Sequence, residues 1–331
     1  MKKEKHPNGW KGKFMKKPVV ITISAILILA LCGCDYLFMR DNTNYQILET
    51  PSEAQSAAPP VTLTARFNTE DFQRVDGSTV TLPLMQLFAA KTTDASPLEI
   101  DNNLKHNKTY QAFYNLTNKD ESGKYVKDII FTTLQSEETI NSSSVELEIK
   151  PAAQDGFVFL VNKENPVQSL TKKQIIDIYT GNITNWKQVG GDDAKILAYQ
   201  RQKDSGSQDG MFDLVMGDNK INNSVTVITN SMEGLVDSIA NYENSKYAIG
   251  YSYYYFTTVQ YVKENTKLLS IGGIEPTITN FSNGSYPLVA KYYAIIRADE
   301  PKDSFARKFL NLVLSDDGQK VVMEAGYVKI N

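Results

Sequence analysis

Apolar residues recur in two different periods along the chain, and the pattern alternates between them after residue 61. Compact apolar runs at 128–131, 158–162, 196–199 and 248–251 predict buried strands. Residues 61–67 alternate apolar and polar side chains, which predicts a short strand or an entry segment. Helical spacing predicts helices around Leu82–Phe88, Ile175–Tyr179, Met211–Val215 and Phe305–Val313. Strands that alternate with helices predict an α/β fold with largely parallel sheets.

Some helix boundaries can also be read from the sequence. Thr171 and Gln174 have the spacing of a capping box, so a helix is expected to begin there, and Gly181 is expected to end it. At the C-terminus we expect two helices, separated by a turn at 316–318, with the second ending at Gly326.

The first 34 residues have the pattern of a secretion signal. Seven lysines and one glutamate in residues 1–17 precede an apolar run at 19–31, which is short for a membrane span. The run ends in Leu31-Cys32-Gly33-Cys34, which resembles the lipobox of bacterial lipoproteins. The resemblance implies cleavage before Cys34 and diacylation of its sulfur. An uncleaved anchor is the alternative, and Met15 is a second candidate start. Polar residues at 41–60 predict a flexible tether from the lipid to the body.

Composition and charge narrow the functional classes. The length of 331 residues suggests two lobes or domains. The net charge is −3, and without residues 1–33 it would be −9, so nucleic-acid binding is not expected. Cys32 and Cys34 are the only cysteines, and His6 and His106 the only histidines. A thiolate or histidine metal site and a histidine-based catalytic triad are therefore hard to build, and we expect no metal, no cofactor and no enzyme.

Two loops between a strand and a helix have the chemistry of an anion site. They are Gly77-Ser78-Thr79 and Ser205-Gly206-Ser207. Glycine lets a ligand approach the backbone, and the hydroxyls are donors that can rotate toward an oxyanion. Arg201, four residues before Ser205, can add a charge-assisted pair. Ordinary helix caps are the alternative interpretation of each loop.

The body resembles the phosphate-binding proteins of bacterial phosphate ABC transporters, which belong to the two-lobed solute-binding superfamily. The resemblance covers nearly all of residues 70–331. The matching segments, in order, are 75–79, 128–131, 159–162, Gln200-Arg201 with 205–208, 249–251, 286–288, 314–319 and 325–328.

The resemblance implies a periplasmic-binding-protein-like fold of the class II type, with each lobe a mostly parallel sheet flanked by helices. It implies lobe one at 61–156 plus 253–331 and lobe two at 157–252. It also implies a monomer on the outer face of the bacterial cytoplasmic membrane, anchored by lipid on Cys34, that delivers inorganic phosphate to an ABC permease. The ligand residues that it implies are Ser78, Thr79, Thr109, Thr132, Arg201, Ser205, Gly206 and Ser207, with Thr133 beside Thr132.

One position departs from the family pattern. Typical members have an aspartate after the strand equivalent to 129–131, where it accepts a proton from monohydrogen phosphate. This chain has Thr132-Thr133-Leu134-Gln135 there. Asp76 or Asp204 could replace the acceptor, although turn or cap chemistry is the alternative for both. A binding or sensing lipoprotein for another oxyanion (sulfate, tungstate or molybdate), not coupled to transport, therefore stays open.

Three further features are interpreted as structural. The aromatic run 251–256 is expected to be a strand that crosses between the lobes, with stacking on a sugar or base as the alternative. His106 lies in a polar stretch and is expected to be a solvated loop residue. Asp120 and Glu121 lie between lysines and predict a solvated turn.

Overall fold

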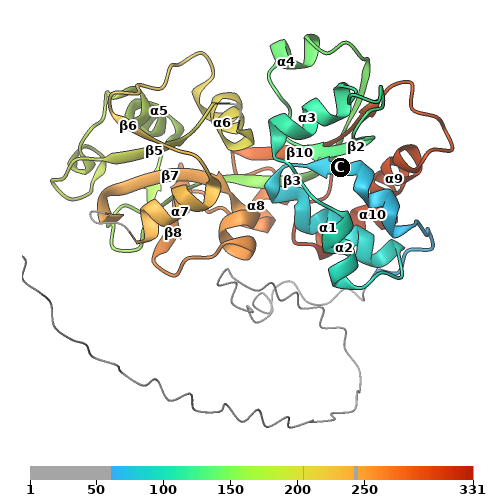
Figure 1. The fold of residues 1–331 in the computed structure, drawn as a ribbon. Helices are drawn as coiled ribbons and strands as arrows, with labels where there is room; N and C mark the ends of the chain where they lie inside the picture. The colour runs from blue at the N-terminus through green and yellow to red at the C-terminus, as the bar shows by residue number, and fades with distance from the viewer. Residues whose placement is uncertain (1–60, 204, 242–244, 331) are drawn as a thin grey trace, which may run out of the picture. The chain divides into compact units, whose positions relative to one another are not determined.

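The computed structural model describes residues 61–203, 205–241 and 245–330, and this part of the chain is an α/β body (Figure 1). The expected signal peptide, Cys34 and tether lie outside these residues. Eight strands form one sheet in the order β1-β2-β10-β3-β7-β5-β6, with β8 paired to β3, and β4 pairs with β9. The strands are β1 (Val75–Gly77), β2 (Ile129–Thr132), β3 (Leu147–Asn162), β4 (Ser169–Leu170), β5 (Leu197–Arg201), β6 (Thr226–Thr229), β7 (Ala248–Tyr253), β8 (Thr266–Leu268), β9 (Ser270–Ile271) and β10 (Val289–Arg297).

Helices cover both faces of this sheet (Figure 1). The α-helices are α1 (Leu82–Thr92), α2 (Pro97–Asn103), α3 (Thr109–Thr117), α4 (Glu137–Asn141), α5 (Lys172–Thr180), α6 (Gly206–Met211), α7 (Met232–Ala240), α8 (Ile278–Ser282), α9 (Phe305–Leu314) and α10 (Asp316–Glu324). Short 3₁₀ helices lie at Thr69–Arg74, Thr79–Thr81, Trp186–Val189 and Ser245–Tyr247, and π-helical turns at Phe212–Met216 and Phe256–Gln260. The predicted capping of α5 is confirmed: Thr171 Oγ1 accepts from the N–H of Gln174, and Gly181 ends the helix with φ of 87°.

The long strand β3 joins two halves of the sheet. Its residues up to Gly156 pair with β10, and its residues from Phe157 on pair with β7. We call the half with β1, β2, β10 and the first part of β3 lobe one. The half with β4 to β9 and the second part of β3 is lobe two. In lobe one, α3 and α4 lie on one face of the sheet, and α1, α2, α9 and α10 lie on the other (Figure 1).

The expected two-lobed α/β fold is confirmed, but the sheets are mixed rather than mostly parallel. β1 and β2 are parallel, as are β5, β6 and β7. The two long strands β3 and β10 run antiparallel to every strand that they pair with in the large sheet. Parallel neighbouring strands need a long crossover connection, usually a helix, whereas antiparallel neighbours do not. β3 and β10 can therefore run antiparallel to the strands beside them.

The expected lobe boundaries stay a prediction, and the strand pairing favours one change to them. β8 pairs with β3 at Leu160 to Asn162, and β9 pairs with β4, although residues 266–271 were expected in lobe one. The chain next pairs with lobe one at Val289 in β10. We therefore propose that lobe two includes residues up to about 288.

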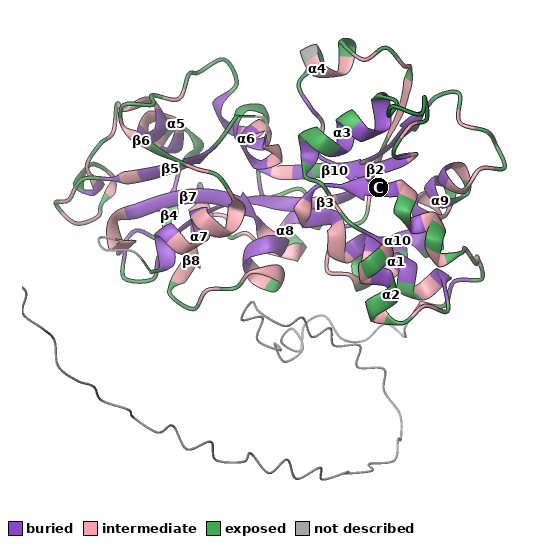
Figure 2. Cartoon of the chain, viewed as in Figure 1, coloured by how far each residue is buried: buried purple, intermediate pink, exposed green. Residues whose placement is uncertain are grey.

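The central strands are the most buried part of the body, and exposed residues gather on the outer helices and loops (Figure 2). In lobe one, Phe309 of α9 packs edge-on against Phe72, Phe88 and Phe131 at centroid distances of 5.3 to 5.7 Å. On the opposite face, α3 packs Ala112, Phe113 and Leu116 against Ile130 and Ile295. No helix of the described residues is both long enough and apolar enough to cross a membrane.

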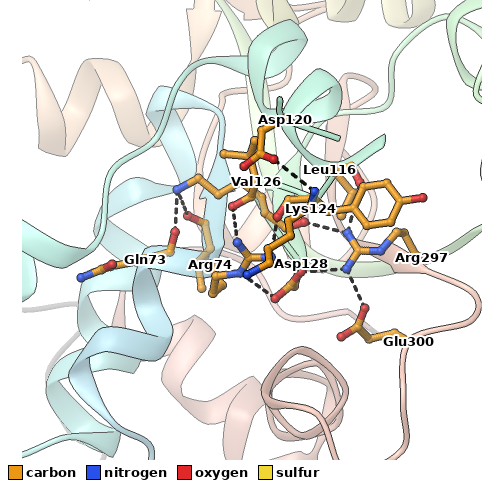
Figure 3. A network of polar contacts seen from close by, with 12 residues as sticks. Gln73, Arg74, Leu116, Asp120, Lys124, Val126, Asp128, Arg297 and Glu300 are labelled. Carbon is orange, nitrogen blue, oxygen red and sulfur yellow. Dashed lines mark hydrogen bonds and ion pairs between the residues drawn. The ribbon is translucent and has the colours of Figure 1, made fainter. Parts of the chain in front are cut away.

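A polar network holds the strand ends of lobe one that face away from the loops at Gly77 and Thr132 (Figure 3). Asp128, just before β2, accepts from Arg74 at 2.7 Å and from Arg297 at 2.7 Å. Arg297, at the end of β10, also pairs with Glu300 at 2.8 Å. Burial raises the pKa of the Asp128 carboxyl, but the hydrogen bonds from both arginines outweigh burial and hold its pKa below the ordinary value.

One open local interpretation is settled, and one prediction is wrong. Residues 61–68 contain no strand, so of the two alternatives for this stretch the entry segment is the correct one. The expected turn at 316–318 is the first turn of α10, because Ser315 accepts from the N–H of Gly318 and caps that helix.

Candidate functional site

A cavity of about 380 Å³ lies between the two lobes, and both contribute polar side chains to its wall. Lobe one contributes Ser78 and Thr79 after β1, Thr109 at the start of α3, and Thr133 after β2. Lobe two contributes Arg201 at the end of β5 and Ser205, Gly206 and Ser207 around the start of α6. Seven of the eight predicted ligand residues thus line this cavity, although the segments that carry them are about 90 or more positions apart between the two lobes.

Thr132 is the candidate that the structure places elsewhere. It is the last residue of β2, is fully buried, and is absent from the cavity wall. Side chains alternate along a strand, so Thr132 shares the face of Ile130, which α3 covers. Thr133 follows the strand and lines the cavity instead.

The loop after β1 is held in place by many contacts. The Ser78 N–H donates to the Phe131 carbonyl at 3.0 Å. The Ser78 carbonyl accepts from the Thr81 hydroxyl at 3.0 Å and contacts His106 Nδ1 at 2.8 Å. A Cβ at Gly77 would lie 2.2 Å from the Phe131 carbonyl oxygen, so only glycine fits there.

Contacts across lobe two position the second loop. The Arg201 N–H donates to Tyr251 Oη at 3.0 Å and to Gln208 Oε1 at 3.1 Å. Ser205 caps α6, with its Oγ accepting from the Gln208 N–H. The Tyr253 hydroxyl donates to the Gly206 carbonyl at 2.8 Å. These bonds fix the backbone from which the Arg201 and Ser207 side chains project.

Several buried donors on the cavity wall have no partner in the described chain. They are Nε and Nη1 of Arg201, Oγ of Ser207 and Oγ1 of Thr133. Arg201 is only 5% exposed. Burial lowers its pKa from the ordinary value, yet an arginine stays protonated at any physiological pH. A buried cation and hydroxyls without acceptors are costly, so the cavity is suited to an anion that accepts from all of them.

The lobes approach each other closely at Gly206. A Cβ built on Gly206 would lie 2.6 Å from Thr109 Oγ1 and 2.8 Å from Thr133 Oγ1, both in lobe one. The Gln135 amide also reaches Asp209 Oδ2 of lobe two at 3.5 Å. The hydroxyls of lobe one and the loop of lobe two can therefore contact the same ligand.

Comparison with known proteins agrees with this architecture. The family model described as the PBP superfamily domain matches residues 64–317. The chain belongs to the PBP superfamily.

Named relatives of this superfamily member are phosphate-binding proteins. Phosphate-binding protein PstS of Borreliella burgdorferi is 27% identical over 183 residues, which cover 54% of this chain and 64% of the relative. PstS of Staphylococcus epidermidis is 33% identical over 187 residues, covering 53% and 54%. The alignments thus span about half to two thirds of the curated relatives. A Clostridium perfringens crystal structure with bound phosphate, assigned as a phosphate ABC transporter substrate-binding protein, has a TM-score of 0.61 and 26% identity, covering 78% of this chain and 98% of that one.

Asp76 and Asp204 were the two candidates to accept a hydrogen bond from the ligand. In this PBP-superfamily chain, the carboxylate of Asp76 instead accepts hydrogen bonds from neighbouring protein groups. It is fully buried, and its carboxylate accepts from the N–H groups of Gly77 and Asn107 at 2.7 Å and from the amides of Asn107 and Asn115. It ties β1 to the loop before α3 and does not line the cavity. Asp204 lies outside the described residues.

Glu233, in the first turn of α7, is a cavity residue that the sequence interpretation missed. It is the one carboxylate among the described residues of the cavity wall, and its charge acts on Arg201. The signal available in the sequence was weak, because an acidic residue after a Ser cap is common in helices.

The expectation for His106 is wrong. Its Nδ1 contacts the Ser78 carbonyl, and its Nε2 is buried. Burial lowers the pKa of His106 to about 4, and the contact with Ser78 and the charge of Asp76 only partly offset this. His106 thus supports the first ligand loop as a neutral ring.

Only the first half of the aromatic run 251–256 is a strand, because β7 ends at Tyr253 and the residues from Tyr254 to Gln260 are helical. Tyr251 and Tyr253 lie buried in β7 beside β3 and are part of the core. Asp120 accepts from Ser122 and Lys124 in an exposed turn, as predicted. Within the described residues, no group of three or more His, Cys, Asp or Glu side chains is arranged to hold a metal ion.

Proposed function

We propose that this chain captures inorganic phosphate between its two lobes and delivers it to an ABC permease. The observation that carries the proposal is the set of unpartnered buried donors of Arg201, Ser207 and Thr133 on one cavity wall. The phosphate-binding relatives and the fold of a phosphate-bound neighbour support it. The proposal is binding without turnover.

The hydrogen-bond donors of the cavity wall can supply the binding free energy that micromolar affinity requires. Micromolar binding requires about −8 kcal/mol. A hydrogen bond to a charged group contributes roughly 1.5–3 kcal/mol. Arg201 with two hydroxyls and the backbone of the two ligand loops therefore reaches this range without a metal.

Phosphate is favoured over sulfate by the one described carboxylate on the cavity wall. A carboxylate such as Glu233 repels a fully ionised oxyanion but accepts a hydrogen bond from a protonated one. Monohydrogen phosphate carries such a proton at neutral pH, whereas sulfate does not. Glu233 would thus act in place of the aspartate that typical family members have after the strand at 129–131.

We further propose an extracytoplasmic location with a lipid anchor on Cys34, and a monomeric state. The location is motivated by the N-terminal pattern of lysines, apolar run and Leu31-Cys32-Gly33-Cys34. Mass spectrometry of the membrane fraction tests the anchor, because a diacylglyceryl group on Cys34 changes the mass of the N-terminal peptide. An unmodified peptide beginning at Met1 would contradict it.

Calorimetry tests the phosphate proposal. The full chain in detergent is unfolded and refolded to remove bound ligand, and is then titrated with phosphate and with sulfate. We expect heat with phosphate, little with sulfate, and loss of the phosphate heat in Arg201→Ala. Lys187→Ala, which removes an exposed lysine of lobe two, is the control and should bind normally. Heat with sulfate alone would support the alternative oxyanion, and no heat with any oxyanion would overturn the proposal.

A further inference from the structure

The crossing between the lobes is concentrated in a few residues. In β3, Gly156 is the last residue paired with β10 and Phe157 is the first paired with β7. The second connection follows Tyr253, where β7 ends. A rotation of one lobe against the other has to be absorbed by torsions in such connecting segments.

The carboxylate of Asp155 lies between these connections. Its side chain accepts from the Gly156 N–H at 2.8 Å, the Tyr255 N–H at 3.2 Å and the Tyr292 hydroxyl at 3.0 Å. The donors come from β3, from the connection after β7 and from β10. One buried side chain, only 2% exposed, therefore holds together the elements that meet at the crossing.

Tyrosine rings surround this carboxylate. Tyr253, Tyr254 and Tyr255 approach it from the end of β7, Tyr292 from β10, and Tyr327 from the C-terminal segment. Tyr255 and Tyr327 stack at 4.2 Å. No lysine, arginine or histidine of the described chain forms an ion pair with Asp155. The nearby acids Asp209 and Asp213 act electrostatically on Tyr253, and neither acts on Asp155 itself.

The ionisation of Asp155 therefore depends on two opposing effects. Burial raises the pKa of Asp155 to about 7, and the hydrogen bonds from Tyr292, Tyr255 and Gly156 keep it from rising further. A change in those hydrogen bonds changes the ionisation near neutral pH.

We propose that Asp155 is a proton-sensitive hinge residue, whose ionised form holds the lobes in the arrangement of this structure and whose neutral form lets the cleft open. The inference deepens the proposed function, since the cleft that it regulates is the anion site.

The direction of the pH response follows from the hydrogen bonds of Asp155 that an opening motion changes. The N–H groups of Gly156 and Tyr255 belong to the connecting segments, so they move relative to the carboxylate when the torsions there change. The rings of Tyr292 and Tyr327 belong to lobe one and stay around Asp155. In the open form Asp155 thus accepts fewer hydrogen bonds in the same apolar surroundings. The pKa of Asp155 is therefore higher in the open form, and protonation favours that form. Acidification from pH 9 to pH 7 should open the cleft.

Distance measurements between spin labels in the ligand-free full chain test this. Cys32→Ser and Cys34→Ser remove the natural thiols, and Glu121→Cys and Lys220→Cys place labels on exposed sites of lobe one and lobe two. If the pKa of Asp155 is one unit higher in the open form, the ratio of open to closed molecules should rise about fivefold between pH 9 and pH 7 and approach a plateau of about tenfold below pH 6. A ratio that does not change with pH overturns the proposal.

Three variants assign the response. Asp155→Asn should abolish the pH response. Tyr292→Phe removes a donor that lowers the pKa of Asp155, so it should move the response to higher pH. Asp193→Asn is the control, because it removes an exposed acid of lobe two that pairs with Lys187, and it should leave the response unchanged. A response that persists in Asp155→Asn, or that Asp193→Asn abolishes, overturns the proposal. If Asp155→Asn does not fold, the test rests on Tyr292→Phe. A pH response in Tyr292→Phe at the same pH as in the wild type would then overturn the proposal.

Phosphate calorimetry at pH 8 on the same proteins separates this inference from the proposed function. The spin-label experiment contains no ligand, so its outcome does not depend on which anion binds. A protein that binds phosphate but shows no pH-dependent opening refutes only the hinge proposal. A protein that opens with pH but does not bind phosphate refutes only the phosphate proposal.

Discussion

At Gly206 the absence of a side chain lets the two lobes approach each other closely. Its Cα faces two hydroxyls of the opposite lobe, Thr109 Oγ1 and Thr133 Oγ1. Both hydroxyls and the Gly206 loop line the cavity, so the close approach brings donors of both lobes to one ligand. Glycine is needed here for space and not for an unusual backbone torsion, because Gly206 is absent from the residues with positive φ.

Gly206→Ala should therefore weaken anion binding while leaving the fold stable. Its Cβ would lie within 3.0 Å of both hydroxyls, so the lobes have to separate and the donors no longer converge. We expect phosphate affinity to fall at least about tenfold, which is about 1.4 kcal/mol, by calorimetry. A double-mutant cycle with Thr133→Ala is the control: the cost of Gly206→Ala should be smaller when the opposing hydroxyl is absent. An equal cost in both backgrounds would contradict the steric explanation.

At the scale of elements, the strands of lobe one are anchored at one end and carry ligand loops at the other. Asp128 joins Arg74, just before β1, to Arg297, at the end of β10 (Figure 3). The loops at Gly77 and Thr133 leave the same strands at their opposite ends. The network can thus stabilise the lobe without contacting the ligand.

Asp128→Asn should lower the free energy of unfolding by about 2 kcal/mol at pH 7, because Arg297 is buried and loses a charged partner. The pKa of Asp128 is lowered in the folded state, so its contribution is present above the ordinary value near 4 and is lost as pH falls through the folded pKa. Urea unfolding at pH 7 and pH 3 should show a difference between variant and wild type that shrinks at pH 3. Asp193→Asn, an exposed acid paired with Lys187, is the control and should change little. A difference that is the same at both pH values would argue against the ion pairs as its cause.

At the scale of the whole molecule, the half-buried His106 and the buried Asp155 give stability opposite dependences on pH. The pKa of His106 is lowered to about 4, so the folded protein holds fewer protons than the unfolded chain between pH 4 and 6.5. The pKa of Asp155 is raised to about 7, so the folded protein holds more protons between pH 4 and 7. In the shared range, the His106 contribution falls on acidification and the Asp155 contribution rises.

Removing either group should expose the contribution of the other. In His106→Gln, the free energy of unfolding should rise on acidification from pH 6.5 to 4.5. In Asp155→Asn it should fall over the same range, each by about 1.4 kcal/mol per pH unit at most, and the wild type should lie between them. Urea unfolding at several pH values measures all three. Parallel curves for the three proteins would show that neither group titrates as the structure indicates.

Local signals in the chain determined much of this fold. The buried runs at 128–131 and 158–162, the capping of α5 by Thr171 and the stop at Gly181 depend on neighbours within a few residues, and the structure contains them. The loops at Gly77 and Ser205 were also predicted, because glycine and hydroxyl residues lie there between a strand and a helix, where they can serve as a helix cap, an anion site or both. Residue type alone indicated that they could bind an anion.

Other features were decided by contacts between distant segments, which no local pattern contains. β3 pairs with β10 and then with β7, so the length and antiparallel direction of the crossing strand depend on residues about 90 to 150 positions away. His106 is half-buried, with its Nε2 covered, because its Nδ1 contacts the Ser78 carbonyl of the loop after β1. Thr133 rather than Thr132 reaches the cavity because α3 covers the face of β2 that carries Thr132. Asp155 acquires its role only where three separate segments bring their donors to one carboxylate. The sequence by itself determined the elements and the donor types, whereas burial and convergence, which set the charge and reach of each group, arose only on tertiary folding.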